Sequence, residues 1–86
     1  MDAHTVNLTA REEYMIANAT DLGRAIAAAR RELGLTQRDL ALAIGAGERF
    51  IVELEAGKPT AQLGKALAAA KAVGLRLEIT SGAGQA

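Results

Sequence analysis

The feature that most constrains the fold is a break between two short helical patterns in the stretch from Thr36 to Lys58. Apolar residues recur at helical spacing on both sides of the break, and the sequence IGAG separates them. Each pattern is about eight residues long, or roughly two turns of helix. Two short helices joined by a tight turn can pack at a steep angle, which leaves the outer face of the second helix in solvent. The stretch therefore predicts a helix-turn-helix unit.

Further helical patterns on both sides extend this unit into a bundle. The four predicted helices cover about residues 21–33, 37–44, 48–55 and 61–73. Thr36 and Asp39 form a T-x-x-D capping sequence for the second helix, and Thr60 is placed to cap the fourth. Residues predicted to face the core are Leu22, Ala25, Ile26, Ala29, Leu33, Leu40, Ala41, Ile44, Ile51, Leu54, Leu63, Ala66, Leu67, Ala70 and Val73. The predicted fold class is mainly α, a compact bundle of four or five helices.

A single strand is predicted after the last helix. In LRLEIT, residues 75–80, Leu75, Leu77 and Ile79 alternate with polar residues, which is the period of a strand. One strand cannot satisfy its own backbone groups, so it needs a partner. Within the chain the candidate is HTVNL, residues 4–8, but the same strand of a second chain is favoured. The strand therefore predicts a homodimer.

The 86 residues allow one domain at most. Residues 1–20 are expected to be a polar N-terminal extension, in which a capping sequence at Thr9 can start a short helix that ends at Asn18. Residues 21–74 form the bundle, 75–80 the dimerising strand and 81–86 a disordered tail. With no cysteine, no apolar run near 18 residues and no export leader, the chain is expected to be cytoplasmic and to have no membrane partner.

Catalytic chemistry is not expected. His4 is the sole histidine and Ser81 the sole serine, and the carboxylates are scattered among basic residues, so no nucleophile–base pair or metal-ligand set can be assembled. The sequence predicts no enzyme, no cofactor, no metal and no small-molecule substrate. The formal net charge is zero, which argues against a strong nucleic-acid binder, although basic residues outnumber acidic ones by eight to six between residues 21 and 71.

Spaced residues across the central region resemble the Xre-type helix-turn-helix family, which includes the lambdoid phage repressors. The matching residues are Leu35-Thr36-Gln37, Leu40-Ala41, Ile44-Gly45, Ile51 and Leu54-Glu55-x-Gly57-Lys58. Longer stretches, DLGRAIAAARRELGLTQ, RFIVELEAGKPTAQLGKAL and VGLRLEI, are similar to the HipB-like antitoxins in particular. The resemblance extends from about Asp21 to Ile79.

This resemblance implies a lambda-repressor-like bundle that dimerises partly through its C-terminal strands. It implies a repressor that binds palindromic operators on double-stranded DNA in its own promoter. HipB-like proteins also bind and restrain a HipA-like Ser/Thr kinase toxin, so a toxin partner is implied as well. A solitary phage-type repressor is an alternative within the same class.

The resemblance also implies roles for individual residues. The residues expected to face DNA bases are Glu48, Arg49, Val52 and Glu53. An Arg can bond guanine and a carboxylate can accept from cytosine, but a Glu repels phosphates unless it is paired, so Glu48 or Glu53 can instead hold Arg49. The expected phosphate contacts are Gln37, Arg38 and Lys58, and Arg30 and Glu55 are expected to form a structural ion pair.

Three other residues have structural interpretations. Phe50 is expected to pack against the bundle, and Gly23 and Gly64 are expected where helices approach closely. A different class of function stays open, namely a protein-interaction module that keeps the helix-turn-helix bundle but has little affinity for DNA. Zero net charge and the two glutamates, Glu48 and Glu53, favour this alternative.

Overall fold

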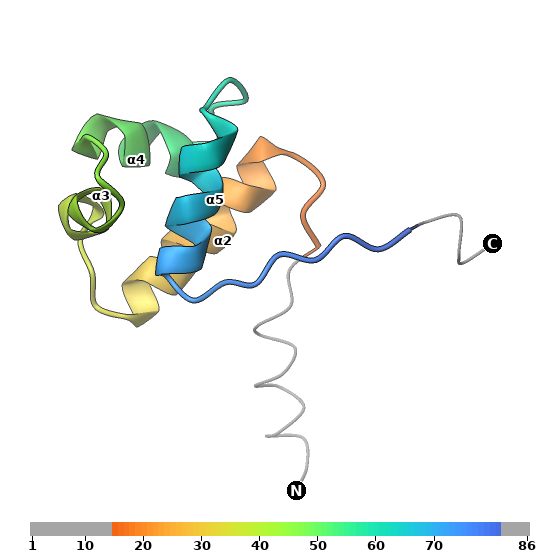
Figure 1. The fold of residues 1–86 in the computed structure, drawn as a ribbon, viewed down its shortest axis with the longest axis horizontal. Coiled ribbons are helices and arrows are strands. Elements are labelled where there is room, and N and C mark those ends of the chain that lie inside the picture. Colours follow the sequence, from red (N-terminus) through yellow and green to blue (C-terminus); the bar gives the residue numbers. More distant parts are fainter. Residues whose placement is uncertain (1–14, 82–86) are drawn as a thin grey trace, which may run out of the picture.

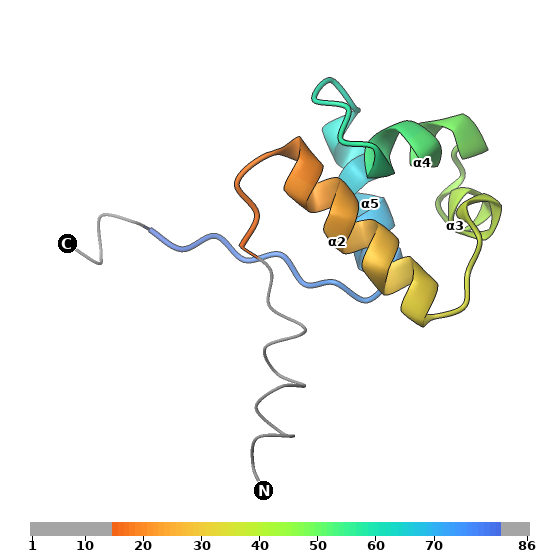
Figure 2. The same cartoon turned by 180° about the vertical axis from the view of Figure 1, so that it is seen from behind.

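The computed structural model describes residues 15–81, and these residues form a bundle of four helices (Figure 1). The helices are α2 (Ala19–Glu32), α3 (Gln37–Ile44), α4 (Glu48–Glu55) and α5 (Leu63–Ala72). Helix α3 packs against α4 and α5, and α2 packs against α4. Opposite views show α2 and α5 one in front of the other, with α3 and α4 together at one end of the bundle (Figures 1 and 2). The predicted helix-turn-helix bundle is confirmed.

Local hydrogen bonds set where α3 begins and ends. The backbone N–H of Asp39 donates to the Thr36 hydroxyl, the backbone N–H of Thr36 donates to the Asp39 carboxylate, and both distances are 2.9 Å. This reciprocal arrangement confirms the predicted cap. At the other end, Gly45 has φ +70°, a left-handed conformation in which glycine has no steric penalty. The chain therefore turns sharply before α4 begins.

The core contains large residues from three helices and small ones from the fourth. Ile26 of α2, Leu40 of α3 and Ile51 of α4 are the largest fully buried side chains. Helix α5 contributes Ala66, Ala69 and Ala70, and alanine allows the other helices to approach its backbone closely. Phe50 is half-buried against this core, with the Lys65 Nζ 5.8 Å from the centre of its ring. The prediction that Phe50 packs against the bundle is confirmed.

Three leucines predicted to face the core are exposed instead. The exposed fractions are 56% for Leu33, 68% for Leu63 and 44% for Leu67. Helix α5 has the sequence LGKALAAAKA, which is apolar almost throughout, so the spacing of its residues does not select a buried face. The alanine face is the buried one because it fits closer to the other helices. Helix α5 also starts later than predicted, with Gln62 rather than Thr60 at its N-cap.

The two helical glycines differ in their surroundings. A methyl group on Gly23 would overlap the carbonyl oxygen of Leu54 and lie 2.8 Å from that of Glu55, so the backbones of α2 and α4 are in close contact at this position. A methyl group on Gly64 would meet no atom within 4 Å. The interpretation of a glycine at a close helix contact is correct for Gly23 and wrong for Gly64.

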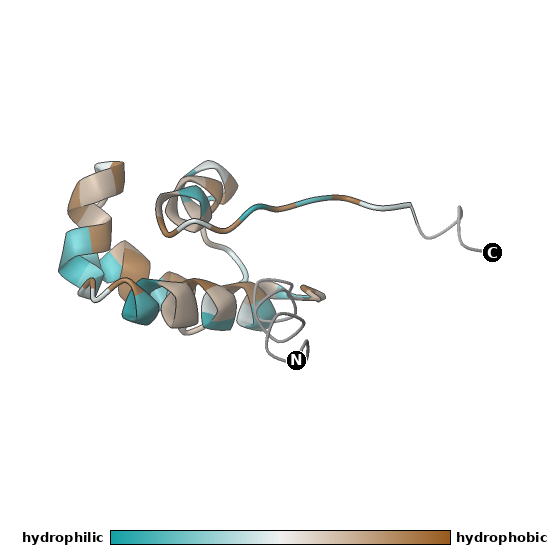
Figure 3. Cartoon of the chain, turned by 90° about the horizontal axis from the view of Figure 1, so that it is seen from below, coloured by the Kyte–Doolittle hydropathy of each residue, from teal (hydrophilic) through white to brown (hydrophobic). Residues whose placement is uncertain are grey.

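The predicted strand at residues 75–80 does not form within the described residues. Residues 75–81, which we call the C-terminal arm, have no regular secondary structure and leave the helices as an extended segment (Figures 1 and 3). Leu75 still packs against the core, whereas Ile79 is fully exposed. A lone extended segment has no second strand to complete its hydrogen bonds, so no sheet is formed. The alternation of apolar and polar residues along the arm is visible in Figure 3.

The N-terminal predictions are tested only in part. The expected cap at Thr9 and the candidate partner strand at residues 4–8 lie outside the described residues. Residues 15–18, the end of the expected short helix, are not helical, because the Asn18 side chain accepts a hydrogen bond from the Asp21 N–H and so caps the start of α2. Between residues 15 and 81, no helix has the length and apolar character that crossing a membrane requires.

Candidate nucleic-acid interface

The outer face of α4 is formed by four residues that point away from the core. Ile51 and Leu54 are buried, and Phe50 and Glu55 also pack inward, so the outward positions of this short helix carry Glu48, Arg49, Val52 and Glu53. The side chain of Arg49 is 90% exposed. Gly47 occupies the N-cap and makes no side-chain hydrogen bond, so the first backbone N–H groups of α4 have no side-chain cap. Arg49 therefore lies on an accessible helix whose N-terminal backbone N–H groups have no side-chain cap.

Glu53 connects the two cations nearest to this face. Arg49 Nε donates to Glu53 Oε2 at 3.3 Å, and Lys58 Nζ donates to Glu53 Oε1 at 3.0 Å. The hydrogen bond from Lys58, followed by that from Arg49, lowers the pKa of Glu53, so the carboxylate stays ionised. The three residues carry a net charge of one positive unit, and Arg49 is oriented by a partner four residues along the same helix.

A second network joins three helices behind this face. Arg30 of α2 donates from Nε to Glu55 Oε2 at 2.6 Å and from Nη2 to Glu55 Oε1 at 2.9 Å. Gln37, the first residue of α3, donates from Nε2 to Glu55 Oε1 at 3.0 Å. The side chains of Arg30 and Glu55 are only 10% and 6% exposed. The side chain of Gln37 is therefore fixed in place by a buried ion pair.

Glu55 remains charged in this setting. Burial raises its pKa, but the hydrogen bonds from Arg30 and Gln37 and the positive charge of Arg30 together outweigh burial, and the resulting pKa is below the ordinary value for a glutamate. Arg30 also donates from Nη1 to the carbonyl oxygen of Leu35 at 2.8 Å. This bond ties the turn that leads into α3 to the same ion pair, so the α2, α3 and α4 backbones are held in one arrangement.

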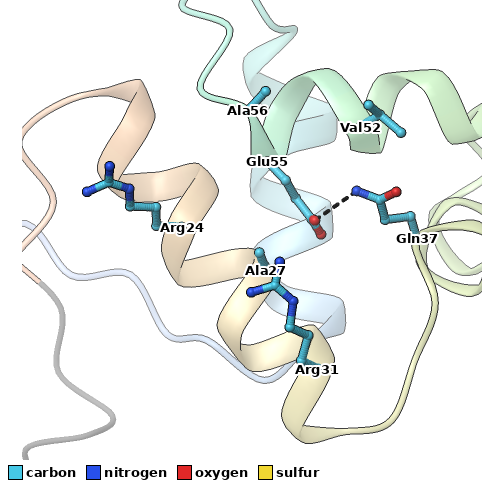
Figure 4. Close-up of a pocket in the computed structure, with 7 residues that line it drawn as sticks. All are labelled: Arg24, Ala27, Arg31, Gln37, Val52, Glu55 and Ala56. Atoms are coloured by element: carbon cyan, nitrogen blue, oxygen red, sulfur yellow. Dashed lines mark hydrogen bonds between the residues drawn. The ribbon is translucent and has the colours of Figure 1, made fainter.

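A hollow of about 340 Å³ lies beside this network (Figure 4). Its walls include Arg24, Ala27 and Arg31 of α2, together with Gln37 of α3 and Val52 of α4. Arg24 and Arg31 are not among the residues predicted from sequence to contact a ligand. Arg24, Ala27 and Arg31 are spaced at i, i+3 and i+7, which places all three on one side of α2. This spacing is the sequence signal from which the two arginines could have been found. The hollow meets the outer face of α4 at Val52.

The remaining predicted site residues lie around these features. Arg38 is exposed on α3, one residue after Gln37, and Lys58 follows the end of α4. Among the described residues no three His, Cys, Asp or Glu side chains come together as metal ligands would. The polar groups on this side of the bundle are dominated by Arg, Lys and amide donors, which suit an extended anion with many acceptor oxygens.

Comparison with known proteins places these features in a family. The helix-turn-helix family model HTH_3 matches residues 26–79. A curated relative from Sinorhizobium fredii, described as the uncharacterized HTH-type transcriptional regulator y4mF, is 45% identical over 64 residues. That alignment covers 74% of this chain and 84% of the relative.

Solved structures of HipB have a similar fold. A HipB–O4 20mer complex aligns with a TM-score of 0.73 and 23% identity, covering 81% of this chain and 99% of the other. A chain of a HipA–HipB–O2–O3 complex also aligns with a TM-score of 0.73 and 23% identity, and the alignment covers 81% of this chain and 99% of that chain. At 23% identity, this similarity shows a shared fold and nothing further.

Proposed function

This chain belongs to the helix-turn-helix family of transcriptional regulators, and from that premise we propose that it is a dimeric, sequence-specific DNA-binding repressor. The observation that carries the proposal is the exposed outer face of α4, with Arg49 held by Glu53 and Lys58 beside it. An α-helix of this kind fits the major groove, where arginine can bond both O6 and N7 of guanine. Binding blocks access to a promoter.

The proposed contacts divide into base readers and phosphate contacts. Arg49 reads a guanine, Val52 meets a thymine methyl, and Glu48 and Glu53 face the same groove. Within this group, Glu53 acts mainly by holding Arg49, because its carboxylate already accepts from two cations. Phosphates are contacted by Gln37, Arg38 and Lys58, which position the protein without reading sequence.

Dimerisation is part of the proposal and is supported by exposed apolar side chains outside the DNA-facing side. They include Met15, Leu63, Leu67, Leu77 and Ile79. The C-terminal arm presents Leu75, Leu77 and Ile79 on one side and lacks a strand partner among residues 15–81. Pairing with the arm of a second chain satisfies its backbone groups and covers these residues. A two-fold dimer then places half-sites about 34–36 Å apart, or a multiple of that distance.

We further propose that the chain is the antitoxin of a HipBA-like pair that represses its own promoter and binds a HipA-like kinase toxin. The support is the fold shared with HipB in complexes named for operator duplexes and for HipA. The sequence similarity to HipB-like antitoxins in the central region also supports the antitoxin proposal. A solitary repressor differs only in having no toxin, and co-purification with the product of a neighbouring kinase gene distinguishes the two.

A specific observation favours one alternative, a protein-interaction module with little DNA affinity. Glu53 pairs with both Arg49 and Lys58 and offsets one of their two positive charges, and the whole chain has zero formal net charge. On this alternative the outer face of α4 binds another protein. The two functions differ in how their binding to DNA depends on salt, since each neutralised phosphate contributes about 0.9 to the slope of log affinity against log salt.

The test is selection of bound duplexes from a random DNA pool, followed by fluorescence anisotropy titration of the enriched duplex at several salt concentrations. The repressor proposal predicts an enriched inverted repeat and steep salt dependence. No enrichment, together with weak binding that salt barely changes, would overturn it in favour of the interaction module.

A further inference from the structure

The hollow beside α2 is the strongest unassigned feature on the DNA-facing side of the bundle. Arg24 and Arg31 are seven residues apart on one helix, which separates their Cα atoms by about 10 Å along the axis. Between them lies Ala27, only 6% exposed, whose small side chain leaves the hollow open. Figure 4 shows the two arginines at opposite ends of this face of α2, with Gln37 and Val52 across the hollow.

The guanidinium groups of Arg24 and Arg31 have no direct partner within residues 15–81, although the positive charge of Arg31 contributes, after that of Arg30, to lowering the pKa of Glu55. No hydrogen bond or ion pair involves the guanidinium of Arg24 or Arg31 in that part of the chain, although both line the hollow. The one carboxylate in the wall, Glu55, already accepts two bonds from Arg30 and one from Gln37. The charge of Glu55 is therefore matched by Arg30, and the two wall arginines leave the hollow with a positive excess.

The position of the hollow indicates what kind of anion reaches it. Val52 belongs both to the outer face of α4 and to the wall, and Gln37 opens α3 on the opposite side. If α4 enters the major groove of DNA, the DNA strand at the edge of that groove would run past Gln37 and across this hollow. Planar guanidinium groups suit phosphate oxygens because they can donate two parallel hydrogen bonds.

We propose that the hollow binds the sugar–phosphate backbone of DNA, with Arg24 and Arg31 contacting separate phosphates of the strand that borders the groove entered by α4. This inference rests on the proposed repressor function and adds a backbone site to it. On this proposal a chain of zero formal net charge binds DNA through local basic side chains, since Arg24 and Arg31 add two positive charges beside the outer face of α4. Contacts of this kind strengthen binding to every sequence alike.

The experiment compares the full-length chain with its Arg24→Gln/Arg31→Gln variant. Each is titrated by fluorescence anisotropy, across a range of salt concentrations, with the enriched duplex and a scrambled duplex of equal length. The proposal predicts that the slope of log affinity against log salt decreases in magnitude by about 1.8 per protomer, since each lost phosphate contact removes about 0.9. Affinity for the two duplexes should fall by the same factor.

Two controls distinguish a local contact from a change in total charge or a loss of folding. The variant Lys65→Gln/Lys71→Gln removes the same charge from exposed positions of α5 away from the hollow and should leave the slope within half a unit of wild type. The variant Arg24→Lys/Arg31→Lys keeps the charge and should keep the slope. Thermal unfolding of every variant establishes that each is folded.

The outcomes separate this inference from the proposed function. If wild type binds with steep salt dependence but the Arg24→Gln/Arg31→Gln slope is unchanged, or changes no more than in the Lys65→Gln/Lys71→Gln control, the backbone site is wrong and the repressor function stands. If wild type binds no duplex in a salt-dependent way, both proposals are wrong.

Discussion

Glu55 is the residue whose loss should disturb the fold most. Its carboxylate accepts from Arg30 of α2 and Gln37 of α3, and both members of the ion pair are nearly buried. Removing one partner of such a pair leaves the other charge without compensation. Glu55→Ala should therefore lower the free energy of unfolding by about 3 kcal/mol or more, measured by chemical denaturation. A loss below about 1 kcal/mol would mean that water reaches Arg30 and replaces the carboxylate.

The same carboxylate should make stability depend on acid pH. The pKa of Glu55 in the folded chain lies below its ordinary value because the bonds from Arg30 and Gln37 outweigh burial. A lowered folded-state pKa contributes stability that is complete above the unfolded-state pKa, about 4.3, and is lost as pH falls through the folded-state pKa. The melting temperature should thus be nearly constant from pH 7 to pH 5 and then decline.

Glu55→Gln tests this assignment. The variant should melt at a lower temperature than wild type at pH 7, and the difference should shrink towards pH 3 because the variant has no charge to lose at this position. Part of the acid decline should remain, since the pKa values of Asp39 and Glu53 are also lowered, by hydrogen bonds from Thr36 and Lys58 respectively. Parallel curves for the two proteins would exclude Glu55 as a source of the decline.

Arg49 and Lys58 share Glu53 as a partner, but the proposed function gives them different roles. Arg49→Ala should cost about 1–3 kcal/mol of binding to the selected duplex and relax the preference at one base pair, because it removes a base contact. Lys58→Ala should weaken selected and scrambled duplexes equally, since it removes a phosphate contact. Competition anisotropy with both duplexes measures the two effects. Equal losses on both duplexes for Arg49→Ala would show that Arg49 does not read a base.

At the scale of the helices, the contact between α2 and α4 depends on Gly23. A methyl group at this position meets the carbonyl oxygens of Leu54 and Glu55, which are backbone atoms and cannot rotate away. Gly23→Ala should therefore push α4 from α2 and destabilise the bundle by about 1–3 kcal/mol. The displacement should also weaken DNA binding, because the outer face of α4 moves relative to Gln37.

Gly64→Ala is the matched control for Gly23→Ala. Gly64 lies in α5 in open space and outside the left-handed region, so alanine fits there without strain. The same substitution should stabilise the chain by about 0.4–1 kcal/mol by reducing the freedom of the unfolded state. Urea denaturation of the two variants measures both effects. If both substitutions shifted the free energy of unfolding in the same direction, the close contact of Gly23 with α4 would not be what determines the effect of alanine there.

At the scale of the whole molecule, the C-terminal arm should decide whether two chains associate. Ile79 and Thr80 are adjacent and exposed, but they lie on the apolar and polar sides of the arm. Ile79→Asp should weaken dimerisation at least tenfold, because it places a charge on the side that pairing covers, whereas Thr80→Asp should change it little. Sedimentation equilibrium gives the dissociation constants. A similar effect of both substitutions would indicate that the arm is not the interface.

The helices and their order could be predicted from short-range signals. The bounds of α4 are predicted correctly, and α3 has the predicted cap and the predicted end at Gly45. Such features depend on chemistry within a few residues, such as a hydroxyl that accepts a backbone N–H or a glycine that adopts a left-handed turn. The outward positions of α4 follow from helical spacing, because Ile51 and Leu54, three residues apart, mark its inward side.

Only the tertiary structure decided which faces pack and which charges meet. Helix α5 is apolar nearly all round, so its alanine face was selected by how closely other helices can approach, and Leu63 and Leu67 were left exposed. Gln37 was predicted from sequence as a phosphate contact, but its bond to Glu55 depends on how α3 and α4 are packed. The hollow between Arg24 and Arg31 arises in the same way. The physical reason is that caps and turns are local, whereas burial and ion pairing depend on residues brought together from distant parts of the chain.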